Sequence, residues 1–263
     1  VYDLENATLL PGLADLHVHL TWNPSDLGYE GLAVSTTDEA IRGVVNAGKT
    51  LMAGFTVARN LGATGYADVS LRDAIADGSI PGPRLQVSGE MIGSTGGHCD
   101  YNKLPVEYDV SREGVADGPW AVRQQVRKNR KYGADVIKFC ATGGTTSKGT
   151  NPGVRQYTFE EMQALVDEAH TLGMPVAAHA HGTEGILFAI RAGVDSIEHS
   201  SLIDEEGLEL ARKNGTFLSI NAYTPIYMMA KGEAMGMLPE SVEKASKLAE
   251  RRLQTYRTAS RPL

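Results

Sequence analysis

Two pairs of histidines in this sequence stand two residues apart at the ends of apolar runs. His17 and His19 close one run, and His179 and His181 close another. Side chains of a β-strand alternate between its faces, so histidines at this spacing point the same way. Neutral imidazole nitrogen is a common ligand of zinc and similar ions. The spacing therefore indicates metal binding, although one pair alone would also suit ordinary histidines at a strand end.

Two more residues with ligand chemistry lie at comparable places. His199 ends the apolar run 196–199, and Lys138 lies inside the apolar run 134–140. A lysine in an apolar strand loses the hydration of its ammonium group unless it is paired or uncharged. We therefore expect Lys138 either to form a salt bridge with a carboxylate across the interior or to lose its charge.

The elements that must position these residues alternate along the chain. Strands are predicted at residues 13–19, 55–59, 84–91, 134–140, 175–179, 196–199 and 216–221. Helices are predicted at residues 37–53, 68–77, 120–132, 158–172, 185–192, 204–214 and 239–256. Thr158, followed by Glu161 three positions on, would form a capping box. This alternation is typical of parallel β-α units.

Seven strands favour a barrel over an open sheet, because no Gly-x-Gly-x-x-Gly turn follows the first strand. In a β/α barrel the carboxyl ends of the strands share one mouth, where active sites lie. Five of the seven histidines close predicted strands, namely His17, His19, His179, His181 and His199. Their clustering predicts a metal site at the mouth of the barrel.

The composition limits the classes of protein that need to be considered. The chain has 263 residues, of which 42% are hydrophobic and 22% charged, as in ordinary globular proteins. A net charge of −7 argues against a nucleic-acid partner. Neither a membrane span nor a signal peptide is expected. The two cysteines, Cys99 and Cys140, stand far apart, so we expect a cytoplasmic location rather than a disulfide-stabilised secreted scaffold.

With these residues, the chain resembles the amidohydrolase superfamily, in particular its dipeptidase and carboxypeptidase members related to prolidase and imidazolonepropionase. Five stretches carry the resemblance, in the family's order. They are Leu-Pro-Gly-Leu-Ala-Asp-Leu-His-Val-His at 10–19, Gly-Gly-His-Cys-Asp at 96–100, Val-Ile-Lys-Phe-Cys-Ala-Thr-Gly-Gly at 136–144, His-Ala-His-Gly at 179–182 and Ser-Ile-Glu-His at 196–199. Together they span nearly the whole chain, which is more specific than any single motif.

The resemblance implies a centre with two divalent metal ions, for which zinc is our first expectation. It implies that His17 and His19 bind one ion and that His179 and His199 bind the other. Lys138 would be carbamylated by carbon dioxide and would bridge both ions as a carboxylate. Carbamylation would replace a buried cation with an anion that the two ions neutralise.

The resemblance also implies the substrate class. A hydroxide bridging the two ions would attack the carbonyl of a dipeptide or N-acyl amino acid with a free carboxylate, of the Xaa-Pro or Xaa-Arg/Lys type. His98 and His181 would hold that carboxylate, and Tyr223 is a weaker candidate for the same pocket. From the residues alone, both histidines could equally be solvated loop residues. The expected partners are a small-molecule or dipeptide substrate and further copies of the chain in a homo-oligomer.

The sequence departs from the family pattern at its carboxyl end. The family places a general-base aspartate in a Gly-Thr-Asp-like turn after strand eight, and no such turn is present. We therefore expect the general base beyond residue 263 and no catalytic residue within the chain. The predicted fold is an α/β, TIM-type (β/α)8 barrel over residues 10–263, truncated before strand eight. Residues 1–9 are a possible remnant of the accessory β-domain, which is otherwise missing.

Other functions stay open at this point. Without the aspartate, the chain could be an inactive metal-binding fragment, and a cyclic-amide hydrolase of the imidazolonepropionase type is a further alternative. Phosphate binding by the Gly-rich stretch 143–149 is disfavoured, because the stretch lacks the Gly-x-x-x-x-Gly-Lys-Ser/Thr order. We expect this stretch to form a mobile flap over the site.

Overall fold

Seven parallel strands form the centre of the computed structural model, which describes residues 5–259. One sheet has the order β1 (Leu13–Val18), β2 (Phe55–Asn60) and β3 (Arg84–Val87). The other has the order β4 (Ile137–Cys140), β5 (Val176–Ala180), β6 (Ser196–His199) and β7 (Phe217–Ser219). The two sheets adjoin between β3 and β4, where the amide of Asp135 donates to the carbonyl of Val87 at 2.8 Å. The predicted α/β fold with parallel strands is confirmed.

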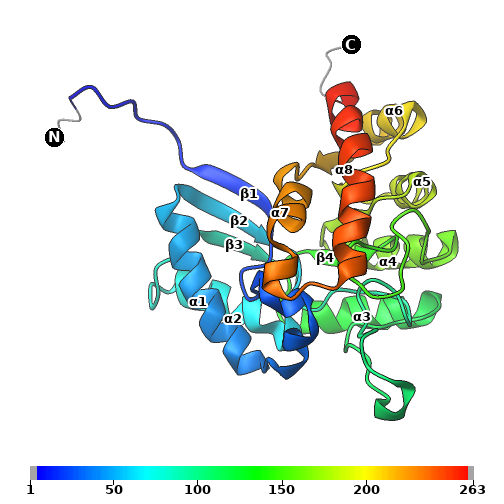
Figure 1. The fold of residues 1–263 in the computed structure, drawn as a ribbon, viewed down its shortest axis with the longest axis horizontal. Coiled ribbons are helices and arrows are strands. Elements are labelled where there is room, and N and C mark those ends of the chain that lie inside the picture. Colours follow the sequence, from blue (N-terminus) through cyan, green and yellow to red (C-terminus); the bar gives the residue numbers. More distant parts are fainter. Residues whose placement is uncertain (1–4, 260–263) are drawn as a thin grey trace.

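Helices flank the sheets (Figure 1). They are α1 (Thr36–Met52), α2 (Ala67–Ala76), α3 (Pro119–Lys131), α4 (Phe159–Thr171), α5 (Thr183–Ala192), α6 (Glu205–Asn214), α7 (Tyr223–Lys231) and α8 (Pro239–Ala259). Short 3-10 turns occur at Pro24–Leu27, Tyr29–Ala33, Thr64–Tyr66, Val106–Tyr108 and Glu233–Met235. The first two helices cover the β1–β3 sheet, and α3 to α6 cover the β4–β7 sheet. Helices α7 and α8 pack against each other.

Local sequence signals explain where several helices begin. The predicted capping box is confirmed, because Thr158 Oγ1 accepts from the amide of Glu161 at 3.2 Å and the Glu161 carboxylate accepts from the amide of Thr158 at 2.7 Å. Ser35 and Asp38 form the same motif at the start of α1. Helix α7 was not predicted from the sequence, since it contains Pro225. This proline stands in the first turn, where a missing N–H is tolerated.

The larger hydrophobic core lies between the β4–β7 sheet and its helices. Strand residues such as Ile137, Phe139 and Val176 are fully buried there, with Met162 and Leu165 of α4 packed against them. A smaller core, Leu20, Ala47 and Leu71 with their neighbours, lies under the β1–β3 sheet. The site is therefore built on a strongly packed half and a more lightly packed half.

The structure differs from the sequence expectations at strands β3 and β4 and at the two cysteines. Strand β3 ends at Val87 and β4 begins at Ile137, so both are shorter than predicted. Cys99 and Cys140 are joined by a disulfide, with their Cα atoms 6.3 Å apart, which their separation of 41 residues did not suggest. The strand ends and loops of a barrel mouth bring distant residues together, so sequence separation is a poor guide to such contacts.

The two outer strands of the arrangement are β1 and β7, which do not pair with each other in the described residues. Phe217 of β7 is 77% exposed and Leu13 of β1 is 54% exposed. Of the predicted accessory remnant at 1–9, residues 1–4 lie outside the described residues, and residues 5–9 contain no strand. The segment that precedes β1 extends away from the body of the molecule (Figure 1).

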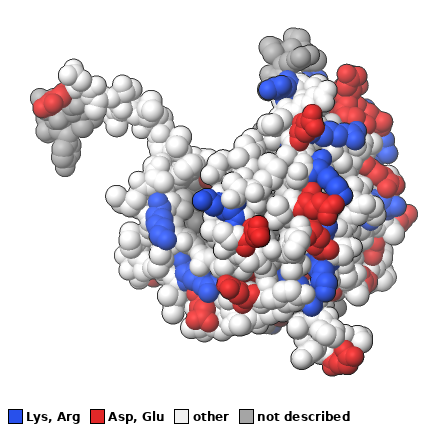
Figure 2. Space-filling view, viewed as in Figure 1, with Lys and Arg blue, Asp and Glu red and all other residues white. Residues whose placement is uncertain are grey.

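Basic and acidic side chains are interspersed across the face in Figure 2. Within residues 5–259, no helix has the length and apolar character needed to cross a membrane. The predictions about nucleic acid, oligomeric state and location stay predictions.

Candidate active site

Strand register brings the histidines to one edge of the fold. In the β5–β6 ladder Ala180 pairs with His199, and in the β4–β5 ladder Cys140 pairs with His179. His181 follows β5 directly. Since all these strands are parallel, their carboxyl ends meet and the side chains that close them come together.

The histidines form one continuous cluster. Ligand nitrogens of His179, His181 and His199 all lie within 4.8 Å of one another. The ring of His17 lies 4.8 Å from that of His199 and 5.4 Å from that of His19, between centroids. The structure therefore brings all five predicted strand-end histidines together, and His181 stands as close to the centre as the two histidines beside it.

Protein partners hold one ring nitrogen of several of these histidines. His181 Nδ1 lies 2.7 Å from Ser201 Oγ, His199 Nδ1 lies 2.9 Å from Asn221 Oδ1, and His17 Nδ1 lies 3.0 Å from Glu198 Oε2. Each contact leaves the other ring nitrogen for a ligand. Metal-binding histidines are usually held in this way. The donor set therefore fits divalent metal ions.

Burial keeps these imidazoles neutral. Burial first, and then neighbouring positive or imidazole groups, lower the pKa values of His19, His179, His181 and His199 well below the usual 6.5. The same causes lower the pKa of His17. A neutral imidazole has the free lone pair that a metal ligand requires. The cluster can thus bind a cation without first losing protons at neutral pH.

Lys138 is buried beside the cluster, with 2% of its surface exposed. Its Nζ lies 3.5 Å from His17 Nε2. Among the described residues no carboxylate forms an ion pair with it, so the expected salt bridge is not found. Burial lowers the pKa of Lys138 to about 8, although Glu198 opposes the shift. Burial therefore makes this amine easier to deprotonate than that of an exposed lysine, which is the direction of the second expectation.

Glu198 is a site residue that the sequence reasoning did not single out. It is fully buried on β6, and its carboxylate accepts from Arg59 Nη2 at 2.6 Å while contacting His17 on its other oxygen. Burial opposes ionisation, but His17, Lys138 and Arg59 lower the pKa of Glu198 to about 2. A charged residue inside the apolar run 196–199 was the signal that could have identified it, as for Lys138.

The backbone at the end of β6 is left-handed. His199 has a φ of 74° and Ser200 a φ of 49°, in a region that residues with a Cβ seldom occupy. The turn directs the His199 ring toward His179, with ring centroids 4.7 Å apart. Such conformations cluster at functional sites because the surrounding structure must hold them.

A cavity of about 390 Å³ opens in front of the cluster. All five strand-end histidines line it, with Lys138 and His98, and its volume suits a small molecule. Tyr223 does not line it and is 69% exposed, so the structure does not bring this predicted residue into the pocket. Its neighbour on α7, Tyr227, faces the cavity instead.

His98 is fixed by the stretch that we expected to form a flap. Its Nδ1 lies 2.8 Å from Ser147 Oγ, and its ring centroid lies 4.2 Å from that of His179. Gly144 packs so closely on this ring that a Cβ there would collide with it. Ser147 and Thr150 are buried and in contact, so the stretch is packed into the fold rather than free-standing.

The buried histidines make the metal-free protein acid-sensitive. Their folded pKa values lie below 6.5, so the unfolded chain binds more protons as the pH falls, and stability is lost below pH 6.5. Each such histidine contributes up to about 1.4 kcal/mol per pH unit. We expect the free energy of unfolding of chelator-treated protein, measured with urea, to fall steeply from pH 7 to pH 5.

His98 provides a check on this expectation, because burial and the charges of Lys138, Lys244 and Arg112 lower its pKa to about 3. A His98→Asn variant should show a shallower slope between pH 6.5 and pH 5. Equal stability at pH 7 and pH 5 would contradict the assignment of neutral buried histidines.

The fold and the site define a β/α-barrel protein with a histidine-rich centre at the carboxyl ends of its strands. The model of the amidohydrolase family matches residues 8–255. The chain belongs to the amidohydrolase family, as the resemblance in the sequence indicated.

Similar proteins of known identity support the assignment. Ochratoxinase of Aspergillus niger is 34% identical over 271 residues, which cover 95% of this chain and 55% of that protein. A crystal structure of a Xaa-Pro dipeptidase with methionine bound in its active site is 37% identical with a TM-score of 0.84, over 95% of this chain and 63% of that one. A prolidase complexed with N-methylphosphonate-L-proline is 32% identical with a TM-score of 0.84, over 98% of this chain and 67% of that one. The chain therefore spans about half the length of the curated relative.

Proposed function

We propose that this protein is a metal-dependent hydrolase that cleaves the C–N bond of a dipeptide or N-acyl amino acid carrying a free carboxylate. The observation that carries the proposal is the convergence of buried histidines and a buried lysine on one small cavity, where no carboxylate of the described residues pairs with that lysine. The chain belongs to the amidohydrolase family, which supports hydrolysis as the reaction. The dipeptidase and the prolidase among its structural relatives support the substrate class.

His17, His19, His179 and His199 would hold two divalent ions, zinc being the first expectation. When bound, the ions would supply an activated water and polarise the amide carbonyl. Glu198 orients His17 through Nδ1 and keeps Nε2 directed toward Lys138.

Lys138 can contribute a bridging ligand once its amine is uncharged. With a pKa lowered to about 8, a useful fraction of the amine is neutral near pH 7. The neutral amine adds to the carbon of carbon dioxide and loses one proton to water, which gives a carbamate. This group would offer two oxygen ligands where the chain otherwise provides only nitrogen. His98 and His181 line the same cavity and would contact the substrate.

Metal analysis and a dipeptide panel test the proposal. Purified full-length protein is expected to contain about two divalent ions per chain and to hydrolyse Xaa-Pro or Xaa-Arg/Lys dipeptides in a chelator-sensitive manner. Incubation with ¹³C-labelled carbon dioxide should give a carbamate resonance that Lys138→Met removes. Less than one ion per chain together with no hydrolysis would rule out the proposed function.

A further inference from the structure

A stack of side chains lines the cavity beside His19. The ring of Trp22 is parallel to that of His19, with centroids 4.5 Å apart and an interplanar angle of 8°. The guanidinium carbon of Arg112 lies 5.3 Å from the centroid of Trp22 and 4.6 Å from that of Tyr101. All four residues line the cavity, so the stack leads from the histidine cluster to a fixed positive charge.

The guanidinium of Arg112 has no acidic partner among the described residues, and no ion pair involves it. The three carboxylates of the cavity wall are engaged elsewhere. Asp26 pairs with Arg42. Glu39 accepts from Trp22 Nε1 and Thr64 Oγ1. Asp100 accepts from Ser111 Oγ and from the backbone amides of Gly96, Tyr101 and Arg112. Among the described residues, none of these carboxylates forms an ion pair with the Arg112 guanidinium.

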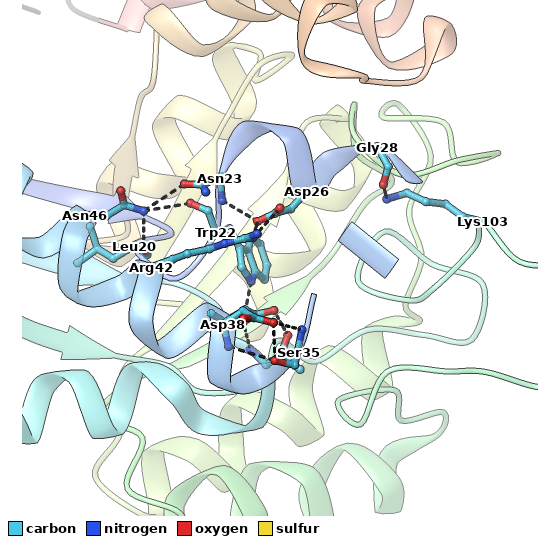
Figure 3. Close-up of polar contacts among 12 residues, drawn as sticks. Leu20, Trp22, Asn23, Asp26, Gly28, Ser35, Asp38, Arg42, Asn46 and Lys103 are labelled. Atoms are coloured by element: carbon cyan, nitrogen blue, oxygen red, sulfur yellow. Dashed lines mark hydrogen bonds and ion pairs between the residues drawn. The ribbon is translucent and has the colours of Figure 1, made fainter. Parts of the chain in front are cut away.

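Hydrogen bonds from neighbouring segments hold the loop that carries Trp22 in place (Figure 3). Asn46 Nδ2 donates to the carbonyl of Leu20 at 2.9 Å, directly before the Trp22 loop. Lys103 Nζ donates to the carbonyl of Gly28 at 2.6 Å and so ties the segment that carries Tyr101 to the same loop. A preorganised site loses less conformational entropy when it binds a ligand.

We propose that Arg112 is a specificity-determining residue that binds the free carboxylate of the substrate. This assignment rests on the proposed function. Its cation–π contacts with Trp22 and Tyr101 use no N–H group, so the guanidinium can form a bidentate bond to a carboxylate. A carboxylate held here would lie in the same cavity as the histidine cluster.

Binding can be measured without turnover, because Trp22 reports on its own contact with Arg112. The chain has two tryptophans, so Trp120→Phe leaves Trp22 as the sole indole fluorophore. In this background we titrate metal-loaded protein with N-methylphosphonate-L-proline and with its carboxamide. Arg112→Met is expected to weaken binding of the carboxylate form at least about 10-fold and to leave the carboxamide unchanged. Arg112→Lys should give an intermediate loss.

Lys148→Met is the matched control, since Lys148 is an exposed cation on the rim of the same cavity. It should bind both probes as the parent does, and with a hydrolysed dipeptide Arg112→Met should raise KM far more than it lowers kcat. Equal affinity of the parent and Arg112→Met for the carboxylate probe, or no binding of that probe by the parent, would overturn the proposal. If the parent hydrolyses no dipeptide yet binds the probe through Arg112, the carboxylate site stands and the proposed function fails.

Discussion

Replacing Lys138 by methionine is expected to abolish hydrolysis while leaving the fold intact. The variant lacks the amine that would carry the bridging carbamate, so we expect a loss of activity on the order of 10³-fold together with loss of bound metal. Its stability should be equal or higher, because the substitution removes a buried amine that pairs with no carboxylate in residues 5–259. Activity, metal content and urea unfolding of the same preparation check both parts.

A second substitution at the same position separates chemistry from packing. Lys138→Ala leaves space for a small acid, so added acetate or propionate should restore part of the lost activity. The carboxylate of the acid would then occupy the place of the proposed carbamate. Full activity of Lys138→Met without any additive would exclude a bridging role for this lysine.

Replacing Glu198 by alanine is expected to destabilise the protein by about 3–5 kcal/mol, which would be the largest effect of any single substitution considered. The substitution leaves the guanidinium of Arg59 without the partner that it contacts at 2.6 Å, and it frees Nδ1 of His17. Arg59 lies on β2 and Glu198 on β6, so the lost pair is also a link between the two sheets. The free energy of unfolding in urea at pH 7 measures the effect.

The exposed pair between Arg191 and Glu206 supplies the comparison. Its nitrogen and oxygen are also 2.6 Å apart, but both side chains are largely in solvent. Glu206→Ala should therefore cost less than about 1 kcal/mol. Similar losses for Glu198→Ala and Glu206→Ala would show that burial does not determine the strength of the Glu198 contacts.

Much of the fold could be predicted from the sequence because the relevant signals are local. The alternation of apolar runs and helical periods predicted the seven strands, and the capping box at Thr158 is contained in four residues. The gathering of the histidines followed from one topological rule, that parallel strands end at the same edge. Helix α7 was missed because a proline argues against a helix unless its position in the first turn is known.

The partners of the site residues could not be predicted in this way. Glu198 meets Arg59 across 139 residues, and Arg112 reaches Trp22 from a loop without regular structure. Such contacts depend on how loops and sheets pack, which periodicity does not encode. Tyr223 illustrates the same limit, because the direction of its side chain depends on the turn that begins α7.

The left-handed backbone at His199 and Ser200 lowers the stability of the fold while it holds the His199 ring in position. Each residue with this backbone costs about 1–3 kcal/mol relative to a relaxed conformation. Glycine at Ser200 would relieve part of that cost, but it would also release the turn that aims the His199 ring. Selection for heat resistance and selection for turnover would therefore favour different residues at this one position. Variants evolved separately under the two pressures should diverge here first.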